Sequence, residues 1–304
     1  MKTKTPLVLF AAVSWLATFS HATLIASDGF LTPGNYNDTS DIHTQNPTLA
    51  GFDGAWVQGG SFFNRIRPSS TGISGFFHNE QAGGLVENAA GNTSRLYTRD
   101  LSESSSNPLI TTGEYWAAHL MRVSDLSSAG ARAGYTILGG DQDGPLRTYG
   151  IVQGAFSVST VGNPDLSNIS QTVNLAPQAD TDYIFLSQVA FTSTGPGVAE
   201  TFNIWALTRD QFEDWDQSVG SLDTASSWHW TDTNNSIIFN EGDPIRLASA
   251  NIEYLSSSAG SGRFQVDELR YATSLEGLAL IPEPSTLVLL GVALGTLLVI
   301  RRRS

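Results

Sequence analysis

Hydrophobic and polar residues alternate along most of the chain between residues 23 and 281. From Tyr183 to Phe191, one face would carry Tyr183, Phe185, Val189 and Phe191, and the intervening residues would form the other. This period of two predicts β-strands, because successive side chains of a strand point to opposite sides of its sheet. Similar patterns predict further strands at residues 55–66, 94–98, 115–123, 132–138, 151–158, 201–207, 245–255 and 263–271.

Clusters of Gly, Asn, Asp and Pro separate these strands, for example at residues 139–144 and 162–165. Such residues form turns. Several strands are apolar on both faces, as expected of inner strands that are covered on both sides. One helical turn is expected near residues 209–215, with a solvated loop as the alternative. We therefore expect a single all-β domain over residues 23–281, folded as a two-sheet antiparallel sandwich.

The N-terminus has the pattern of a secretory signal peptide. Lys2 and Lys4 precede an apolar stretch at residues 6–19, and Ser20 and Ala22 are small residues at the −3 and −1 cleavage positions. This pattern predicts a signal peptide over residues 1–22, recognised by the secretion translocon and cleaved after Ala22. A retained membrane anchor is the alternative, which the short apolar stretch disfavours.

The C-terminus combines a Pro-Glu-Pro tripeptide, an uncharged stretch at residues 285–300 and three arginines. As a helix, the uncharged stretch would be about 24 Å long, slightly short of a hydrocarbon core of about 30 Å. Arginines stay on the cytoplasmic side, so the preceding domain would lie outside the inner membrane. The residues that carry this pattern are Pro282, Glu283, Pro284, Arg301, Arg302 and Arg303.

This order of elements resembles the PEP-CTERM sorting signal of Gram-negative bacteria. The resemblance implies recognition by an exosortase, cleavage near Pro-Glu-Pro, and only transient anchoring in the inner membrane through a C-terminal transmembrane helix. It also implies delivery to the cell surface or to an exopolysaccharide matrix. We therefore assign residues 282–304 to a sorting signal. An ordinary C-terminal anchor is the alternative.

Composition narrows the possible chemistry. The 304-residue chain has no cysteine, which excludes disulfides, zinc–thiolate sites, iron–sulfur clusters and thiol nucleophiles. Without both terminal segments, 11 basic and 28 acidic residues remain, a formal charge of about −17 with no lysine. Nucleic acid is not an expected partner, because phosphate binding needs clustered Lys and Arg. An acidic polysaccharide would be repelled unless divalent cations bridged it to the domain.

Two segments of the body point to a particular kind of sandwich. Residues 27–56, with Ser-Asp-Gly-Phe near their start and Gly-Phe-Asp-Gly-Ala-Trp at their end, resemble the opening of concanavalin A-like, laminin-G-like jelly rolls. Residues 264–271 are similar to the last strand of that superfamily, and residues 115–120 and 133–139 lie between them in the expected order. The resemblance covers almost the whole predicted domain and implies a jelly-roll fold.

No catalytic motif is evident. Laminarinase-type hydrolases with this fold place two carboxylates on one strand in a Glu-x-Asp-x-x-Glu run, and no such run occurs here. The acidic residues at 213–216 have the wrong spacing and are expected to be solvated. His119 shares a face with Tyr115 and Met121, which favours a hydrogen-bonded core residue over a general base. We therefore do not expect an enzyme.

A structural calcium ion is implied by the jelly-roll resemblance. In sugar-acting members, it sits where the first strand meets the last, and Asp267 matches the position of its aspartate ligand. Asp28 or Asp53, together with backbone carbonyls, would complete an oxygen shell of the kind that calcium prefers. The alternative is that Asp267 pairs with an arginine or caps a turn.

Residues 228–235 are the best candidate for glycan binding. On a strand, Trp228 and Trp230 would share one face, beside the polar Asp232 and Asn234. Aromatic rings stack on sugars, and amides or carboxylates bind sugar hydroxyls. The stronger alternative is that both tryptophans are core residues, because tryptophan usually buries most of its surface.

Taken together, the sequence predicts an exported, exosortase-processed surface or matrix protein with a non-catalytic, glycan- or matrix-interacting sandwich domain. Two alternatives stay open. One is a divergent polysaccharide-acting hydrolase or lyase whose carboxylates come from separate strands. The other is a purely structural component of an exopolysaccharide matrix.

Overall fold

The computed structural model describes the chain between residues 23 and 279, except for residues 32–33, 39, 60–65, 78–82, 88–93, 105, 109–111, 125, 128, 140–141, 162–168, 193–200, 216–220, 233–244 and 257–263. The strands are β1 (Leu24–Asp28), β2 (Phe52–Gly59), β3 (Ile66–Ser69), β4 (Gly84–Glu87), β5 (Ser94–Leu101), β6 (Thr112–Val123), β7 (Ala129–Gly139), β8 (Gln142–Val152), β9 (Ala155–Val161), β10 (Ile169–Val173), β11 (Tyr183–Thr192), β12 (Thr201–Thr208), β13 (Trp228–Asp232), β14 (Ile245–Ser256) and β15 (Phe264–Ala272). The short helices are η1 (Ile42–Thr44), α1 (Arg209–Asp214), α2 (Leu222–Ala225) and η2 (Glu276–Leu278).

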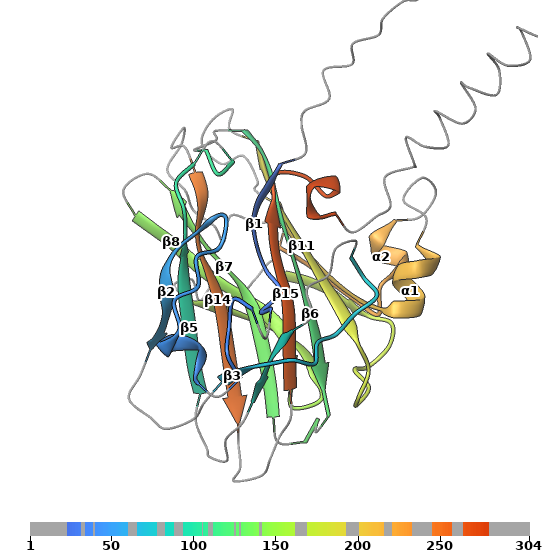
Figure 1. Cartoon of the computed structure of the whole chain (residues 1–304). Helices are drawn as coiled ribbons and strands as arrows, with labels where there is room; N and C mark the ends of the chain where they lie inside the picture. The colour runs from blue at the N-terminus through green and yellow to red at the C-terminus, as the bar shows by residue number, and fades with distance from the viewer. Residues whose placement is uncertain are drawn as a thin grey trace, which may run out of the picture.

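The strands form two antiparallel sheets that pack face to face (Figure 1). The nine-stranded sheet has the order β10-β13-β12-β11-β6-β15-β4-β3, and β1 pairs with β15 as well. The six-stranded sheet has the order β2-β5-β14-β7-β8-β9. The predicted all-β fold, a two-sheet antiparallel jelly-roll sandwich, is confirmed.

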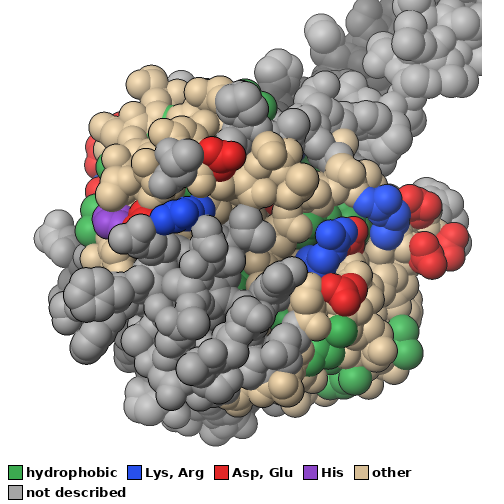
Figure 2. All heavy atoms as spheres, turned by 60° about the horizontal axis from the view of Figure 1, so that its bottom comes forward, with side chains coloured by type: hydrophobic (Ala, Val, Ile, Leu, Met, Phe, Trp, Pro, Cys, Tyr) green, Lys and Arg blue, Asp and Glu red, His purple; other side chains and the backbone are tan. Residues whose placement is uncertain are grey.

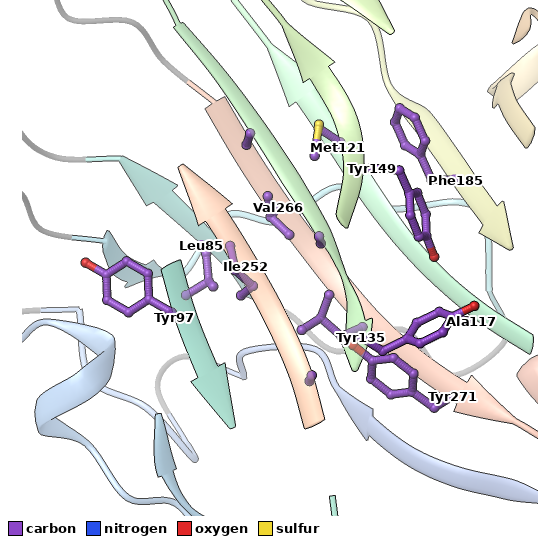
Figure 3. Packing of buried hydrophobic residues seen from close by; sticks show 14 of the residues in the cluster. Leu85, Tyr97, Ala117, Met121, Tyr135, Tyr149, Phe185, Ile252, Val266 and Tyr271 are labelled. Carbon is purple, nitrogen blue, oxygen red and sulfur yellow. The ribbon is translucent and has the colours of Figure 1, made fainter. Parts of the chain in front are cut away.

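The main core lies between the sheets and is rich in aromatic residues. Tyr135 of β7 meets Tyr271 of β15 edge to face, with ring centroids 6.2 Å apart, and Tyr149 of β8 lies beside Phe185 of β11 (Figure 3). The phenolic oxygens are not left unsatisfied: Tyr271 donates to the carbonyl of Gly134. Alternation therefore works as predicted, with one face of each strand buried between the sheets.

A second apolar layer covers the outer face of the nine-stranded sheet. The helices α1 and α2 lie on this side (Figure 1), and the segment at residues 71–77 and the η2 turn add to the cover. We call the buried side chains of this layer the outer cluster: Ile73, Phe76, Trp116, Ala118, Leu120, Ile184, Leu186, Trp205, Leu207, Leu222, Ala272 and Leu278. Because the sheet is covered on both sides, its central strands are apolar on both faces.

Most predicted strands occur near their expected positions, with two clear errors. The pattern at residues 55–66 predicts one strand, but β2 ends at Gly59 and Ile66 begins β3 of the other sheet. The pattern at residues 151–158 predicts one strand, but β8 ends and β9 begins inside it. Gln153 and Gly154 make the reversal with positive φ angles of 49° and 75°. The predicted helical turn is confirmed as α1, which starts with a capping box between Thr208 and Gln211.

The predicted targeting segments, residues 1–22 with Ala22 and residues 282–304, lie outside the described residues. Within the described part of the chain, none of the helices has both the length and the apolar character needed to cross a bilayer.

Candidate functional site

Strand β13 turns its two tryptophans into the molecule. Trp228 and Trp230 are 1% and 4% exposed and belong to the core between the sheets. Trp228 stacks on Phe156 of β9, and Trp230 packs edge-on against Phe202 of β12. A ring buried in this way has no open face on which a sugar could stack. Both tryptophans are therefore core residues and do not form a binding surface. Asp232 is also buried, and Asn234 lies outside the described residues.

The intervening residues of β13, His229 and Thr231, point to the outer face and open a row of polar side chains. Pairing places Thr231 opposite Asn203, Asn203 opposite Gln188, and Gln188 opposite Trp116. Residues that face each other across antiparallel strands share one side of the sheet. The four positions cross β13, β12, β11 and β6, a distance of about 14 Å at about 4.8 Å for each strand.

Hydrogen bonds join these side chains into one chain. Thr231 Oγ1 donates to Asn203 Oδ1 (2.8 Å), and Asn203 Nδ2 donates to Gln188 Oε1 (3.2 Å). Gln188 Nε2 then donates to the Glu114 carboxylate (2.6 Å). His229 Nε2 lies 2.7 Å from Thr231 Oγ1. We call Glu114, Gln188, Asn203, Thr231 and His229 the polar row; its donors all run in one direction, which strengthens each bond.

Stacked aromatic rings run beside the polar row. Trp116 and Trp205 stack with centroids 5.8 Å apart and planes 14° apart, and Trp205 stacks in turn on His229 at 5.6 Å. Trp205 Nε1 donates to Asp223 Oδ1 of α2 (2.7 Å). Trp116 Nε1, in contrast, is buried and has no hydrogen-bond partner, although the side chain borders the row. An unpaired buried N–H carries a free-energy cost that a ligand acceptor would remove.

His229, at one end of the polar row, is held in its neutral form. Burial lowers the pKa of His229, and the nearby Asp223 carboxylate only partly opposes that effect. The imidazole is therefore uncharged near neutral pH, and it donates from Nε2 because Thr231 Oγ1 already gives its proton to Asn203. All five side chains of the row are partly exposed.

The chemistry of the row suits hydroxyl groups. In this arrangement, Gln188 and Asn203 each use one N–H and the carbonyl oxygen, so each amide keeps one N–H for a ligand. Glu114 keeps acceptor capacity on its carboxylate. Alternating donors and acceptors on a fixed row match a molecule that carries many hydroxyls, since each hydroxyl both donates and accepts.

The three carboxylates of the predicted calcium site do not come together. Asp267 is fully buried on the outer face, where its Oδ2 accepts from the N–H of Ile73 (2.9 Å) and its Oδ1 from that of Glu268 (2.8 Å). Asp53 is exposed on β2 of the other sheet and accepts from Ser102 Oγ. Among the described residues, no three acidic or histidine side chains gather into a metal site.

Asp28 belongs to a different environment, inside the sandwich. It lies opposite Leu269, a core residue, and accepts from Tyr36 Oη (2.6 Å) and from Arg99 Nη1 (3.5 Å). Asp28 and Asp267 therefore face opposite sides of the nine-stranded sheet. The calcium prediction now rests on Asp267 alone and stays a prediction.

The residues considered for catalysis do not form a reactive group. His119 is buried in the core against Phe185 and Tyr149, and burial lowers its pKa to about 3. A histidine that stays neutral there and faces no solvent cannot act on an external substrate. Glu213 and Asp214 are exposed on α1, in agreement with the expected solvated surface.

Basic side chains are dispersed over the described surface. Arg122 makes a two-point ion pair with Asp182, and Arg67 lies 3.4 Å from Asp41. On the face seen in Figure 2, each basic side chain likewise has acidic side chains nearby. The sequence does not predict the polar row, because its members are far apart in the chain, at positions 114, 188, 203, 229 and 231. Only the register of the paired strands brings them together.

Comparison with known proteins identifies the end of the chain. Residues 280–303 match the family model of the PEP-CTERM protein-sorting motif. The predicted sorting signal is therefore confirmed, and it indicates an exported protein that an exosortase processes. The match covers a short part of the chain, so it does not classify the domain that precedes it. A search of the curated proteins finds no match.

Several solved structures are distantly similar to most of the chain. The globular domain of calreticulin from T. cruzi has 9% identity and a TM-score of 0.43, over 93% of this chain and 100% of that chain. Peanut lectin has 7% identity and a TM-score of 0.36, over 72% and 97%. A glycosyl hydrolase family protein from Mycobacterium fortuitum has 12% identity and a TM-score of 0.36, over 82% and 99%. Similarities this distant carry no argument about function.

Proposed function

We propose that this exported protein binds glycans of the cell surface or matrix without catalysis, and that the polar row is its binding surface. Trp116 and Trp205 lie buried beside the row and offer no open ring face. The observation that carries the proposal is the unidirectional hydrogen-bonded row, which presents spare amide N–H groups and a carboxylate across four strands. The sorting signal supports it, because the signal marks an exported protein, and the proposed destination at the cell surface or matrix would bring the domain into contact with glycans.

The unpaired N–H of Trp116 adds a sharper argument. A buried donor without a partner is expensive, and Trp116 pairs with Gln188 of the polar row, so a ligand oxygen that reached this N–H from the row would remove the cost. Replacing Trp116 by phenylalanine keeps an aromatic ring and removes only this donor and part of the ring area. No protein group loses a hydrogen bond, but the ring is buried, so the smaller phenylalanine also leaves a cavity and needs a control for packing.

The test uses the purified domain, residues 23–281, on an array of soluble glycans that includes laminarin, dextran and alginate. We expect retention of a neutral glycan, and Trp116→Phe should weaken that binding about tenfold, the equivalent of about 1.4 kcal/mol. Trp228→Phe is the matched control, since Trp228 Nε1 is also buried without a partner but faces the core. Equal effects of the two substitutions would contradict the proposal.

A second pair of variants tests the row itself. The double substitution Gln188→Ala/Asn203→Ala breaks the chain of donors and should abolish detectable binding. Asn46→Ala/Gln178→Ala removes two exposed amides elsewhere on the surface and should leave binding unchanged. Binding that survives loss of the row would place the glycan site elsewhere.

The divergent-enzyme alternative is tested on the same samples. Glu114 and Asp223 are the carboxylates that touch the row and its tryptophans, and they would be the candidates for acid–base work. We expect no release of reducing ends or unsaturated products from any glycan on the array. Turnover that Glu114→Gln or Asp223→Asn abolishes would replace the binding proposal with an enzymatic one.

A further inference from the structure

The described part of the chain ends in the η2 turn. This turn packs on the sandwich next to Thr23, where the described part of the chain begins. Leu278 of η2 is fully buried in the outer cluster, and Gly277 is buried so closely that a Cβ atom there would lie 2.9 Å from that of Ala272. Thr273 N–H donates to the carbonyl of Thr23 (3.1 Å). Figure 1 shows β1 beside β15, with the η2 turn following at the same end of the molecule.

A buried arginine fastens this turn. Arg270 of β15 donates from Nη1 to the carbonyl oxygen of Leu278 (3.2 Å). Its other nitrogens, Nε and Nη2, bind Glu268 Oε2 at 3.0 and 2.9 Å, and its guanidinium lies 4.0 Å from the ring centre of Phe77. Both members of the ion pair are buried, so the guanidinium has a fixed position from which to hold the chain.

The fastened turn lies very close to the processing signal. Only Ala279, Leu280 and Ile281 separate Leu278 from Pro282, and the sorting-motif match already begins at residue 280. From Ala279, a fully extended chain reaches Pro282 within about 11 Å and Ser285, where the predicted membrane segment starts, within about 21 Å. A folded domain held that near the bilayer leaves little space for an enzyme around the tripeptide.

We propose that the η2 turn controls exosortase processing, and that Arg270 and Leu278 are its positioning residues. An enzyme that acts near Pro282 must accommodate the residues before it, and in the folded protein Leu278 is packed into the outer cluster. Cleavage therefore proceeds from a state in which residues 273–279 have moved away from the outer face of the sheet. When opening and closing of the turn are fast relative to cleavage, the rate of processing follows the population of the opened state. The proposal does not depend on glycan binding.

The test follows processing of the full-length chain by pulse–chase labelling in a Gram-negative host that carries an exosortase. One variant inserts Gly-Ser-Gly-Ser-Gly-Ser between Ile281 and Pro282, which lengthens the tether by up to about 21 Å without touching the sandwich. A second variant, Leu278→Ala, loosens the turn. We expect each to shorten the half-time of processing at least about threefold, since truncating a buried leucine favours opening.

Controls make the outcome unambiguous. Leu175→Ala is the matched substitution, because Leu175 is 55% exposed and far from the turn in sequence; it should process at the normal rate. The insertion combined with Leu278→Ala should be no faster than the insertion alone, since both remove one barrier. An insertion variant that is processed at the unmodified rate, or more slowly, would overturn the proposal, as would a precursor that is never processed. Loss of glycan binding would leave it standing.

Discussion

At the scale of single residues, Asp28 is a carboxyl group that is fully buried inside the sandwich. Burial raises its pKa to about 6, although hydrogen bonds from Tyr36 and Phe30 and the charge of Arg99 act in the opposite direction. The folded protein therefore holds a proton on Asp28 more tightly than the unfolded chain does. The stability from this group is present below about pH 4 and is lost as the pH rises through about 6.

This residue predicts an unusual pH dependence. The free energy of unfolding should fall by about 2 kcal/mol between pH 4 and pH 7 on account of Asp28, and Asp28→Asn should remove that slope. Urea unfolding at several pH values measures both proteins. The slope is compared rather than the absolute stability, because the asparagine also breaks the buried pair with Arg99. A variant with an unchanged slope would show that Asp28 is ionised throughout.

Asp267 gives a second prediction at this scale. Its two carboxylate oxygens accept backbone N–H groups, and an asparagine would present an NH₂ group to one of them. Asp267→Asn should therefore cost about 2 kcal/mol in calcium-free buffer, measured by urea unfolding. The calcium prediction is tested separately: calcium must raise the melting temperature of the unsubstituted domain and not that of the variant.

At the scale of elements, helix α1 shows how a short segment is fixed in place. Thr208 Oγ1 accepts from Gln211 N–H, and Gln211 Oε1 accepts from Thr208 N–H and from Ser227 Oγ. The helix carries Phe212 onto the outer cluster, where it packs against Phe76. The cap therefore helps to cover the sheet beside the polar row.

The capping box predicts a modest and specific loss. Thr208→Ala should lower the free energy of unfolding by about 1 kcal/mol, and Thr208→Ser should restore most of it, because serine also accepts from the N3 backbone N–H. Thermal or urea unfolding compares the three proteins. A loss of equal size in both variants would assign the effect to the threonine methyl group instead of the cap.

The sequence predicts elements better than it predicts which face of an element is inside. Alternation in residues 228–232 shows that Trp228 and Trp230 share a face, but it does not say whether that face is the core. The answer depends on β9 and β12, which pack against this strand from distant parts of the sequence. The break between β8 and β9 is hard to predict because Gln153 adopts a positive φ there, a conformation that a sequence usually indicates by glycine.

The candidate site was harder still to predict. Its residues come from four strands, and neighbours in space such as Gln188 and Glu114 are far apart in the chain. No local motif encodes that register. The sorting signal was predictable for the opposite reason: its tripeptide, apolar stretch and arginines are contiguous in the sequence.

At the scale of the whole molecule, charge is the dominant feature. The segment at residues 23–281 has a formal charge of about −17 and contains no lysine, so the folded domain concentrates like charges. Added salt screens this repulsion over a Debye length of about 10 Å at 0.1 M. The unfolded chain spreads the same charges over a larger volume, so added salt stabilises it less than it stabilises the folded domain.

This imbalance predicts salt stabilisation. The melting temperature of the domain should rise by a few degrees between 10 mM and 300 mM sodium chloride at pH 7, and calorimetry measures the shift. At pH 4, where many carboxylates are protonated, the same salt step should have a smaller effect. A melting temperature that falls with salt at pH 7 would mean that ion pairs such as Arg122–Asp182 outweigh the net repulsion.

The place of β15 in the nine-stranded sheet also sets the order of assembly during export. This strand is the last of those that the structure describes, yet it lies between β6 and β4 and also pairs with β1. When a polypeptide crosses a membrane from its N-terminus, β15 therefore emerges after all the strands with which it pairs. Earlier strands have to wait, with open hydrogen-bonding edges, until residue 272 emerges. Final assembly must then take place while the remaining residues are still arriving at the bilayer.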